Sequence, residues 1–565
     1  MRIEILTLLL ILITISIFGQ IPDNRISIED KEFNDYLQNK DNIPVVKGKI
    51  LNLTQKEIEE AIISYSIVTP SEQFQISKSC KLKEDGTFEL QLDYAFPFQQ
   101  IWIRAGKLFY AGIYADTELY IELDANILKS QNGVKFNGLG VKYLGRDGEL
   151  NSFMNNHLLF KREKQLELTS TMRTIKYSTD YLAKYDSLYS ILQELDKEYF
   201  KLNPSNFSWL VINERQSDYF SFLCIRYQGE KMDFELFDKV KSHKSYLTSN
   251  SGMNFYKALF AYVQSNAYSW KDIDYCKYIT FSKLEKTDKL ILDSIVSIHK
   301  NISQSLPYDT SNYLSLIKQA KLFLYDTLVV DNTLQTMRVL DSLFYQSKSD
   351  LLKMKISSKD PNDKRLMTEA VLRNIQTDWC KKNILEQYNE SIKQLASINK
   401  KLEDSKTLVS DNQLGQPINE MPFGAKLYKV DKLDPKVLLA NLKSSFANKA
   451  LVIDFWATWC GPCLQDMPYS KKLHDNLKDL PVEFVYLCTS SSSSIEKWKS
   501  KIAELELSGT HIFVESEIES ELMKLFSLSG FPSYILIDAN GDYQPGVISR
   551  MYDMDKEKLM ELIKK

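Results

Sequence analysis

The chain has 565 residues, which is enough for about three or four domains with a sizeable core. Its 71 basic residues nearly balance its 74 acidic residues, so its charge gives no indication of nucleic-acid binding. Apart from one closely spaced pair, the seven cysteines are scattered, which argues against a disulfide-built scaffold.

The N-terminal segment, residues 1–20, is typical of a secretory signal peptide. Arg2 precedes the apolar run Ile5–Phe18, and the small residue Gly19 follows it. The run has about 14 residues, fewer than the roughly 20 that span a bilayer. Glu4 in the charged region and Ile17 near the expected cleavage site are atypical, so an uncleaved N-terminal anchor remains an alternative. We expect export to the periplasm or cell envelope.

Residues 21–148 carry a β pattern. Lys47–Leu51 opens it, Asp85-Gly86 marks a turn before Thr87–Leu92, and Glu118–Leu123 alternates with a period of two. Several short strands at this spacing predict a small β-sandwich.

Helical periodicity takes over in residues 149–402 and is clearest in Tyr181–Leu202, Leu328–Met354 and Leu366–Leu402. Tyrosine and leucine recur there at helical spacing, which indicates helix packing rather than a cofactor site. Glycine and proline are sparse, so we expect one all-α region.

The last domain is expected at residues 414–565, after a linker at residues 403–413 in a segment rich in polar residues, glycine and proline. Its apolar strand Leu451–Trp456 leads straight to Cys460-Gly461-Pro462-Cys463, which is expected at the start of a helix. Two cysteines so placed indicate thiol-disulfide exchange.

The two thiols should differ in acidity. Cys460, at the helix N-terminus, would lie among unpaired backbone N–H groups and the positive end of the helix dipole, which favour a thiolate. The pKa of such a thiol falls from about 8.5 to roughly 7 or lower. Cys463 lies one turn deeper and is expected to resolve the mixed disulfide. Pro462 suits a first helical turn because its missing N–H would have had no partner there.

Asp454 is the charged residue of the otherwise apolar strand, six residues before Cys460. A carboxyl buried there would have a raised pKa suited to proton transfer with Cys463. The alternative is a strand-end Asp that faces solvent.

A second element lies downstream, where Gly530-Phe531-Pro532-Ser533 precedes the apolar strand Tyr534–Asp538. A proline that enters a strand is sometimes cis. A cis Phe531–Pro532 bond would expose backbone groups beside the dithiol for an extended substrate.

These residues resemble the thioredoxin fold, and most of all the secreted TlpA- and ResA-type thiol-disulfide oxidoreductases. The resemblance rests on WATWCGPC, on Pro468 five residues after Cys463 and on GFPSYILID, and it covers about Leu414–Lys565. Asp466 stands where this branch commonly has Glu. The branch inserts a strand and a helix before the proline element, and the chain has room for strands Glu483–Thr489 and Thr510–Val514 and helices Ile495–Leu507 and Glu519–Ser527.

The resemblance implies a redox disulfide between Cys460 and Cys463. It also implies a catalytic set of Cys460, Cys463, Asp454 and Asp466, and substrate contacts at Trp459, Gly461, Pro462, Phe531 and Pro532. Many secreted members carry Asn at the position of Asp454, and thioredoxins place a Lys on the next strand that Val482–Thr489 lacks. The two carboxyls therefore remain alternatives for the proton transfer. We expect Asp454 to matter more, because Asp466 should be more exposed on its helix.

The expected fold class is thus multidomain: a β-sandwich-like N-terminal domain, an all-α region and a C-terminal α/β thioredoxin fold with an inserted strand and helix. The β region also loosely resembles, through KGKI and DGTFEL, the β-rich domain that precedes thioredoxin domains in secreted proteins of Bacteroidetes-type bacteria.

The leading function hypothesis is a reductase of protein disulfides in the cell envelope, because Gly-Pro between the cysteines resembles the reducing thioredoxin pair. The resemblance implies a membrane thiol reductase as electron donor. We expect no cofactor and no metal, since one CxxC pair supplies half of a usual zinc site. One alternative is a partner-binding envelope protein whose redox domain senses or tethers. Thiol peroxidase is disfavoured, because Ala457 and Ile453 stand where such enzymes have Thr or Ser and Pro.

Overall fold

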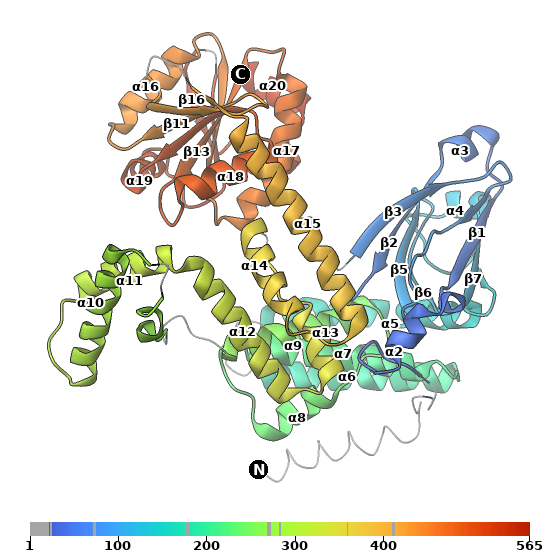
Figure 1. The fold of residues 1–565 in the computed structure, drawn as a ribbon. Coiled ribbons are helices and arrows are strands. Elements are labelled where there is room, and N and C mark those ends of the chain that lie inside the picture. Colours follow the sequence, from blue (N-terminus) through green and yellow to red (C-terminus); the bar gives the residue numbers. More distant parts are fainter. Residues whose placement is uncertain are drawn as a thin grey trace. The chain divides into compact units, whose positions relative to one another are not determined.

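The computed structural model describes residue 22 and residues 25–71, 75–175, 181–267, 273–281, 284–358, 360–408, 413–538 and 540–564, with the side chains of 163–181 and 564 excepted. The expected signal peptide, residues 1–20, lies outside these residues. Contacts divide the chain into two compact units, Met1–Tyr388 and Asn389–Lys565 (Figure 1). Within the described ranges, no helix is long and apolar enough to cross a membrane.

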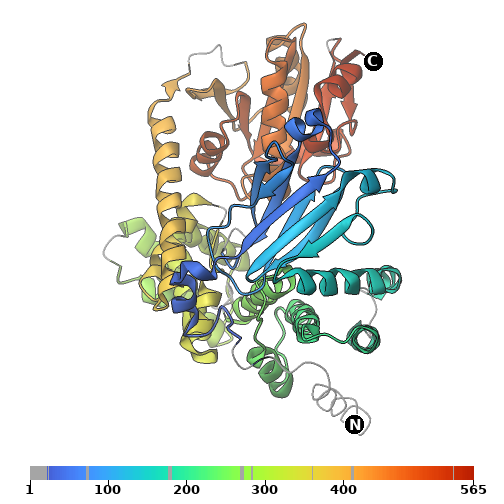
Figure 2. The ribbon, with the colours of Figure 1, turned by 90° about the vertical axis from the view of Figure 1, so that its right-hand side faces the viewer.

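The first unit begins with a β-sandwich, which confirms the predicted N-terminal fold (Figure 2). One sheet has the strand order β4-β1-β7-β8 and the other β3-β2-β5-β6. Inward residues such as Ile121 of the first sheet and Ile103 of the second are buried in one shared core. The strands are β1 Val45–Leu51, β2 Ile62–Val68, β3 Gln75–Lys81, β4 Thr87–Glu89, β5 Gln99–Ala105, β6 Phe109–Ala115, β7 Glu118–Asp124 and β8 Val141–Leu144, with short helices α2 Phe33–Gln38, α3 Gln55–Glu60 and α4 Ala125–Lys129.

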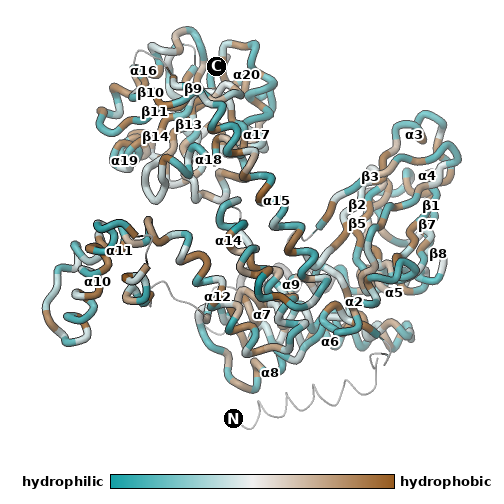
Figure 3. The backbone as a smooth tube through the Cα atoms, viewed as in Figure 1, coloured by the Kyte–Doolittle hydropathy of each residue, from teal (hydrophilic) through white to brown (hydrophobic). Residues whose placement is uncertain are grey.

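Helices make up the rest of the first unit, as the periodicity predicts. They are α5 Gly148–Ile175, α6 Tyr181–Leu202, α7 Ser208–Arg226, α8 Phe234–Ser242, α9 Asn250–Ala267, α10 Lys286–Ser303, α11 Thr310–Phe323, α12 Tyr325–Leu343, α13 Gln346–Lys353, α14 Pro361–Leu372 and α15 Asp378–Glu403. Hydrophobic and hydrophilic stretches alternate along α15 in the hydropathy colouring of Figure 3, as expected for a helix that packs on one side.

Two of the long helices expected from the sequence are each interrupted. The segment 328–354 forms α12 and α13, because the backbone is extended at Phe344. The segment 366–402 forms α14 and α15. Here the Asp350 carboxylate accepts hydrogen bonds from the backbone N–H groups of Gln376 and Thr377 and from the Thr377 hydroxyl. A side chain from α13 thus provides hydrogen-bond acceptors for the backbone N–H groups just before α15.

The segment ahead of the sandwich packs into the helical part of the same unit. The buried carboxylate of Glu29 forms an ion pair with the buried Nζ of Lys348 at 3.2 Å. The Ser347 hydroxyl donates to the Glu29 carbonyl, and the Ser27 hydroxyl donates to the Ser245 carbonyl at 2.6 Å. These contacts join residues that lie more than two hundred positions apart.

The second unit has one eight-stranded sheet with helices on both faces, drawn in orange and red in Figure 1. Its strand order is β16-β15-β12-β13-β14-β11-β10-β9. Strands β12, β13, β14 and β11 run parallel, and β15 is antiparallel to β12. The strands are β9 Lys406–Thr407, β10 Gln416–Glu420, β11 Ala425–Val430, β12 Ala450–Trp456, β13 Val482–Thr489, β14 Gly509–Val514, β15 Ser533–Ile537 and β16 Tyr543–Pro545.

The two faces of this sheet have separate apolar cores. Helices α17 Gly461–Leu477, α18 Ile495–Leu505 and α20 Lys556–Lys564 cover one face, and α16 Pro435–Ser445 and α19 Ser516–Leu525 cover the other. The order β13, α18, β14, α19 is the strand-helix pattern expected between the cysteines and the proline element. The predicted thioredoxin-like fold with its insertion is confirmed, with helix ends shifted by a few residues.

Helix α15 crosses the division between the units, and its residues 389–403 belong to the second unit. Gln394 donates to the Glu504 carboxylate at 3.1 Å, Lys401 donates to the Ala503 carbonyl at 3.1 Å, and Leu402 packs against the α17-side core. Of the expected linker 403–413, the residues Lys406–Thr407 pair with β10 as β9, and residues 409–412 lie outside the described part. The expected domain boundaries stay predictions.

Candidate redox site

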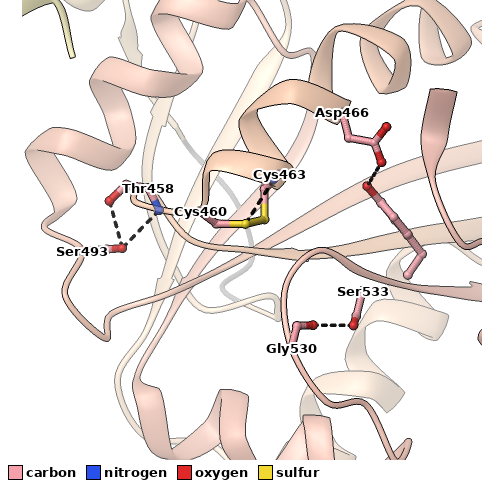
Figure 4. The surroundings of a disulfide bond; sticks show 8 residues. Thr458, Cys460, Cys463, Asp466, Ser493, Gly530 and Ser533 are labelled. Carbon is pink, nitrogen blue, oxygen red and sulfur yellow. Dashed lines mark hydrogen bonds between the residues drawn. A yellow bond between two sulfur atoms is a disulfide. The ribbon is translucent and has the colours of Figure 1, made fainter. Parts of the chain in front are cut away.

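The site is built where strand β12 delivers the chain to helix α17. Every residue of β12 is buried, because the strand lies in the middle of a sheet that is covered on both faces. Cys460 is the N-cap of α17, and its sulfur accepts a hydrogen bond from the Cys463 backbone N–H at 3.1 Å (Figure 4). Pro462 lies in the first turn, where its missing N–H costs nothing.

Cys460 and Cys463 form a disulfide, with their sulfur atoms 2.00 Å and their Cα atoms 5.3 Å apart. Both are buried, Cys463 slightly more deeply. The first-turn N–H groups and the helix dipole favour a negative charge at Cys460 once the disulfide is reduced. The pair can therefore exchange electrons as dithiol and disulfide.

Asp454 lies on the same face of the sheet as the disulfide, and it is buried as expected. In register beside it are Tyr534 of β15 and Tyr486 of β13. Among the described residues its Oδ1 atom has no hydrogen-bond partner. Burial raises the pKa of Asp454 well above its ordinary value, and the nearby Asp466 carboxylate raises it further.

Among the residues that the structure describes, no positive charge offsets this rise in the pKa of Asp454. Tyr486, on the strand where thioredoxins carry a Lys, bonds its hydroxyl to the Ser470 hydroxyl at 3.1 Å. The His511 ring stacks on Tyr486 with centroids 4.6 Å apart. Burial lowers the pKa of His511 to about 3, so this ring is neutral near pH 7.

Asp466 corrects one expectation, because it is not exposed. Its side chain is buried, with 2% of the residue exposed. Its carboxylate accepts three hydrogen bonds, from the Tyr534 hydroxyl at 2.6 Å and from the backbone N–H groups of Met551 and Tyr552 at 2.8 and 3.0 Å. These donors lie 68 to 86 residues further along the chain, so helix position alone gave no sign of them.

An aromatic pair borders the disulfide. Trp459 is 54% exposed, its indole N–H donates to the Ser491 carbonyl at 2.7 Å, and its ring meets Phe531 edge-on with centroids 5.9 Å apart. The Phe531–Pro532 peptide is cis. Gly461 has open space where a Cβ would stand. The fold therefore brings Trp459 and Phe531, which lie far apart in the sequence, to one rim of the site.

Sequence reasoning missed Ser493, which holds the loop before Cys460. The Ser493 hydroxyl accepts a hydrogen bond from the Thr458 backbone N–H at 3.3 Å and bonds the Thr458 hydroxyl at 3.0 Å (Figure 4). The run of serines at 490–494 carries no periodic pattern that would have indicated this role. Cys488 lies in register with Trp456, and burial raises the pKa of its thiol, so it is suited to packing rather than to exchange.

Comparisons with known proteins agree with this geometry. The Redoxin family model matches residues 431–551. Thiol-disulfide oxidoreductase ResA of Bacillus thuringiensis subsp. konkukian is 30% identical over 144 residues, covering 24% of this chain and 78% of the relative. ResA of Geobacillus kaustophilus is 26% identical over 137 residues, covering 23% and 75%.

A solved structure also matches part of this chain. The thioredoxin domain of a thiol-disulfide oxidoreductase from Bacteroides vulgatus is 21% identical and covers 21% of this chain and 81% of its own, with a TM-score of 0.18.

Proposed function

The chain belongs, through its second unit, to the ResA family of thiol-disulfide oxidoreductases, and on that premise we propose that it reduces protein disulfides in the cell envelope. The observation that carries the proposal is the disulfide between Cys460, the N-cap of α17, and Cys463 in its first turn. In the proposed reaction Cys460 attacks and Cys463 resolves.

The reaction starts from the reduced dithiol. The Cys460 thiolate attacks one sulfur of the substrate disulfide, forms a mixed disulfide and releases the other substrate sulfur as a thiolate, which takes a proton from water. Cys463 then gives up its proton and attacks the Cys460 sulfur, which breaks the mixed disulfide and releases the second substrate thiol. The substrate gains two electrons and two protons, and the enzyme keeps the Cys460–Cys463 disulfide.

Asp454 is the proposed acceptor of the Cys463 proton. Its carboxyl is buried on the face of the sheet that carries the disulfide, and its raised pKa brings its proton affinity closer to that of a thiol. Asp466 is bound by three donors, which makes it the less available acceptor. Trp459, Gly461, Pro462, Phe531 and Pro532 are the proposed substrate contacts.

The proposed setting is outside the cytoplasm, supported by the signal-like residues 1–20. In an oxidising compartment the disulfide must be reduced again after each turnover. We propose a membrane thiol reductase as the electron donor, which would return two electrons by dithiol exchange with Cys460. Anchoring by an uncleaved N-terminus stays an alternative to cleavage.

A trapping experiment tests the roles of the two cysteines. Cys463→Ser should accumulate mixed disulfides through Cys460, because the attacking thiolate remains while the resolving thiol is lost. Cys460→Ser should trap nothing, and Cys488→Ser is the matched control that should leave trapping and turnover unchanged. Non-reducing electrophoresis and mass spectrometry identify the trapped proteins.

Equal trapping by both variants, or trapping by Cys460→Ser alone, would reverse the proposed roles. A wild-type protein that is oxidised and reduced reversibly but turns over no substrate would favour the alternative, a redox domain that senses or tethers.

A further inference from the structure

Two exposed tyrosines form an aromatic pair beyond the disulfide. Tyr469 of α17 is 51% exposed, and Tyr552, in the turn Met551–Asp553, is 59% exposed. Their rings meet edge-on, with centroids 6.2 Å apart and an interplanar angle of 66°. Tyrosine combines a large apolar area with little conformational entropy to lose, which makes it a common anchor at protein interfaces.

Asp466 fixes the position of the Tyr469–Tyr552 pair through hydrogen bonds to the turn that carries Tyr552. This buried carboxylate accepts the backbone N–H of Tyr552 at 3.0 Å and that of Met551 at 2.8 Å. Asp466 is on α17, three residues before Tyr469, so one side chain fixes the turn that carries Tyr552 to the helix that carries Tyr469. A surface arranged before binding loses less entropy when a partner arrives.

The pair continues the exposed face of α17 that starts at the redox site. Pro462, Gln465, Pro468 and Tyr469 are exposed, while Cys463, Asp466 and Met467 between them are buried. Positions three to four residues apart share one helix face, so the exposed residues form a stripe. At 1.5 Å per residue, Tyr469 lies about 13 Å along the helix from Cys460.

This distance sets the minimum length of a ligand that could contact both Cys460 and the tyrosine pair. An extended chain covers about 3.3–3.6 Å per residue, so roughly four residues separate a cysteine held at Cys460 from a residue on the tyrosine pair. A small disulfide of a few heavy atoms does not reach that far. We propose that Tyr469 and Tyr552 form a docking surface for the polypeptide that carries the substrate disulfide, which selects protein-bound disulfides over small ones.

The inference rests on the proposed function and names the substrate class of the same site. Its occupant is a disulfide-bearing polypeptide, because the stripe is continuous with the cysteine that attacks disulfides. It adds a second contact region to the Trp459 and Phe531 rim.

The test compares two substrates in the full-length, pre-reduced protein: insulin, as a protein disulfide, and 2-hydroxyethyl disulfide, as a small one. Tyr469→Ala and Tyr552→Ala should each lower kcat/KM for insulin about three- to tenfold, the range expected for losing one aromatic contact. The rate with 2-hydroxyethyl disulfide should stay within about twofold, because that molecule does not reach the pair. Tyr469→Phe and Tyr552→Phe should retain activity on both.

Tyr543→Ala is the matched control. Tyr543 is 38% exposed in the same unit and also lies in an aromatic pair, with Phe526 at 5.4 Å. It faces Ile537, at the end of β15 that lies away from Pro532. This variant should leave both rates unchanged.

Two results would overturn the inference alone: unchanged insulin kinetics in both tyrosine-to-alanine variants, or an equal loss with both substrates, which would indicate a structural role. A wild-type protein that reduced neither substrate would refute the proposed function and this inference with it.

Discussion

At the scale of single residues, the carboxyls of Asp454 and Asp466 are both buried, but they differ in their hydrogen bonds. Asp466 is satisfied by three donors, whereas Asp454 has an unpartnered oxygen among the described atoms and a raised pKa. A buried acid without donors releases its proton late in a titration. Of the two, Asp454 is therefore the carboxyl whose pKa lies well above its ordinary value.

Asp454→Asn should slow the resolution of the mixed disulfide by roughly tenfold or more, because an amide does not take up the Cys463 proton. In the wild type the rate should rise with pH as Asp454 ionises, and the variant should lose this rise. Single-turnover resolution measured across pH checks it. An unchanged profile in Asp454→Asn together with a shifted one in Asp466→Asn would exchange the two assignments.

The same raised pKa should make stability depend on pH. Above about pH 4 the unfolded chain has released the Asp454 proton that the folded chain still holds. Fewer protons are then bound in the unfolded state, so the free energy of unfolding falls as pH rises toward the raised pKa. Asp454→Asn should remove this fall. Chemical denaturation of the oxidised proteins from pH 5 to pH 8 should show that the free energy of unfolding of the variant increases relative to that of the wild type. The same pH dependence in both proteins would contradict the prediction.

Asp466→Asn should destabilise the fold, because one of its acceptor oxygens becomes a donor that faces N–H or O–H groups. We expect a loss of about 3 kcal/mol in the free energy of unfolding. Asp475→Asn, an exposed change on the same helix, is the control and should cost little. If the two variants unfolded at the same denaturant concentration, the hydrogen bonds to Asp466 would not contribute as described.

At the scale of elements, the hydrophobic pattern of the sequence predicted the helices and strands that depend on neighbouring residues in the chain. The alternation in β7 and the apolar residues on both sides of Asp454 in β12 predicted these strands, and Gly-Pro predicted Cys460 at the start of α17. The breaks between α12 and α13 and between α14 and α15 did not follow. Contacts such as that of Asp350 with Thr377 support the second break, and such contacts have no signature in a sequence window. The burial of Asp466 was not predicted for the same reason, because its hydrogen-bond donors are distant in the sequence.

Helix α15 and strand β9 give a prediction at this scale. A fragment of residues 389–565 keeps Leu402 and Leu408 in the two cores of the second unit, whereas residues 414–565 lack both. Both fragments should fold and reduce insulin, since both carry the cysteines, Asp454 and Pro532. The shorter one should be less stable by roughly 3 kcal/mol or more, from two leucines left out of the cores. Equal denaturation midpoints would show that the tail of α15 packs without stabilising.

At the scale of the whole molecule, the first unit is closed by contacts between distant parts of the chain. The pairing of Glu29 with Lys348, and of Ser347 with the Glu29 carbonyl, spans a sequence separation of 318 residues in the second case. During synthesis at about 5–20 residues per second, Glu29 would wait roughly 15–60 s before its partner exists. Until then the buried carboxylate of Glu29 lacks its ion-pair partner, although Ser27 of the same segment can already bond the Ser245 carbonyl. The helical part of the first unit therefore completes its fold late, and a folding helper that protects nascent chains has that interval in which to act.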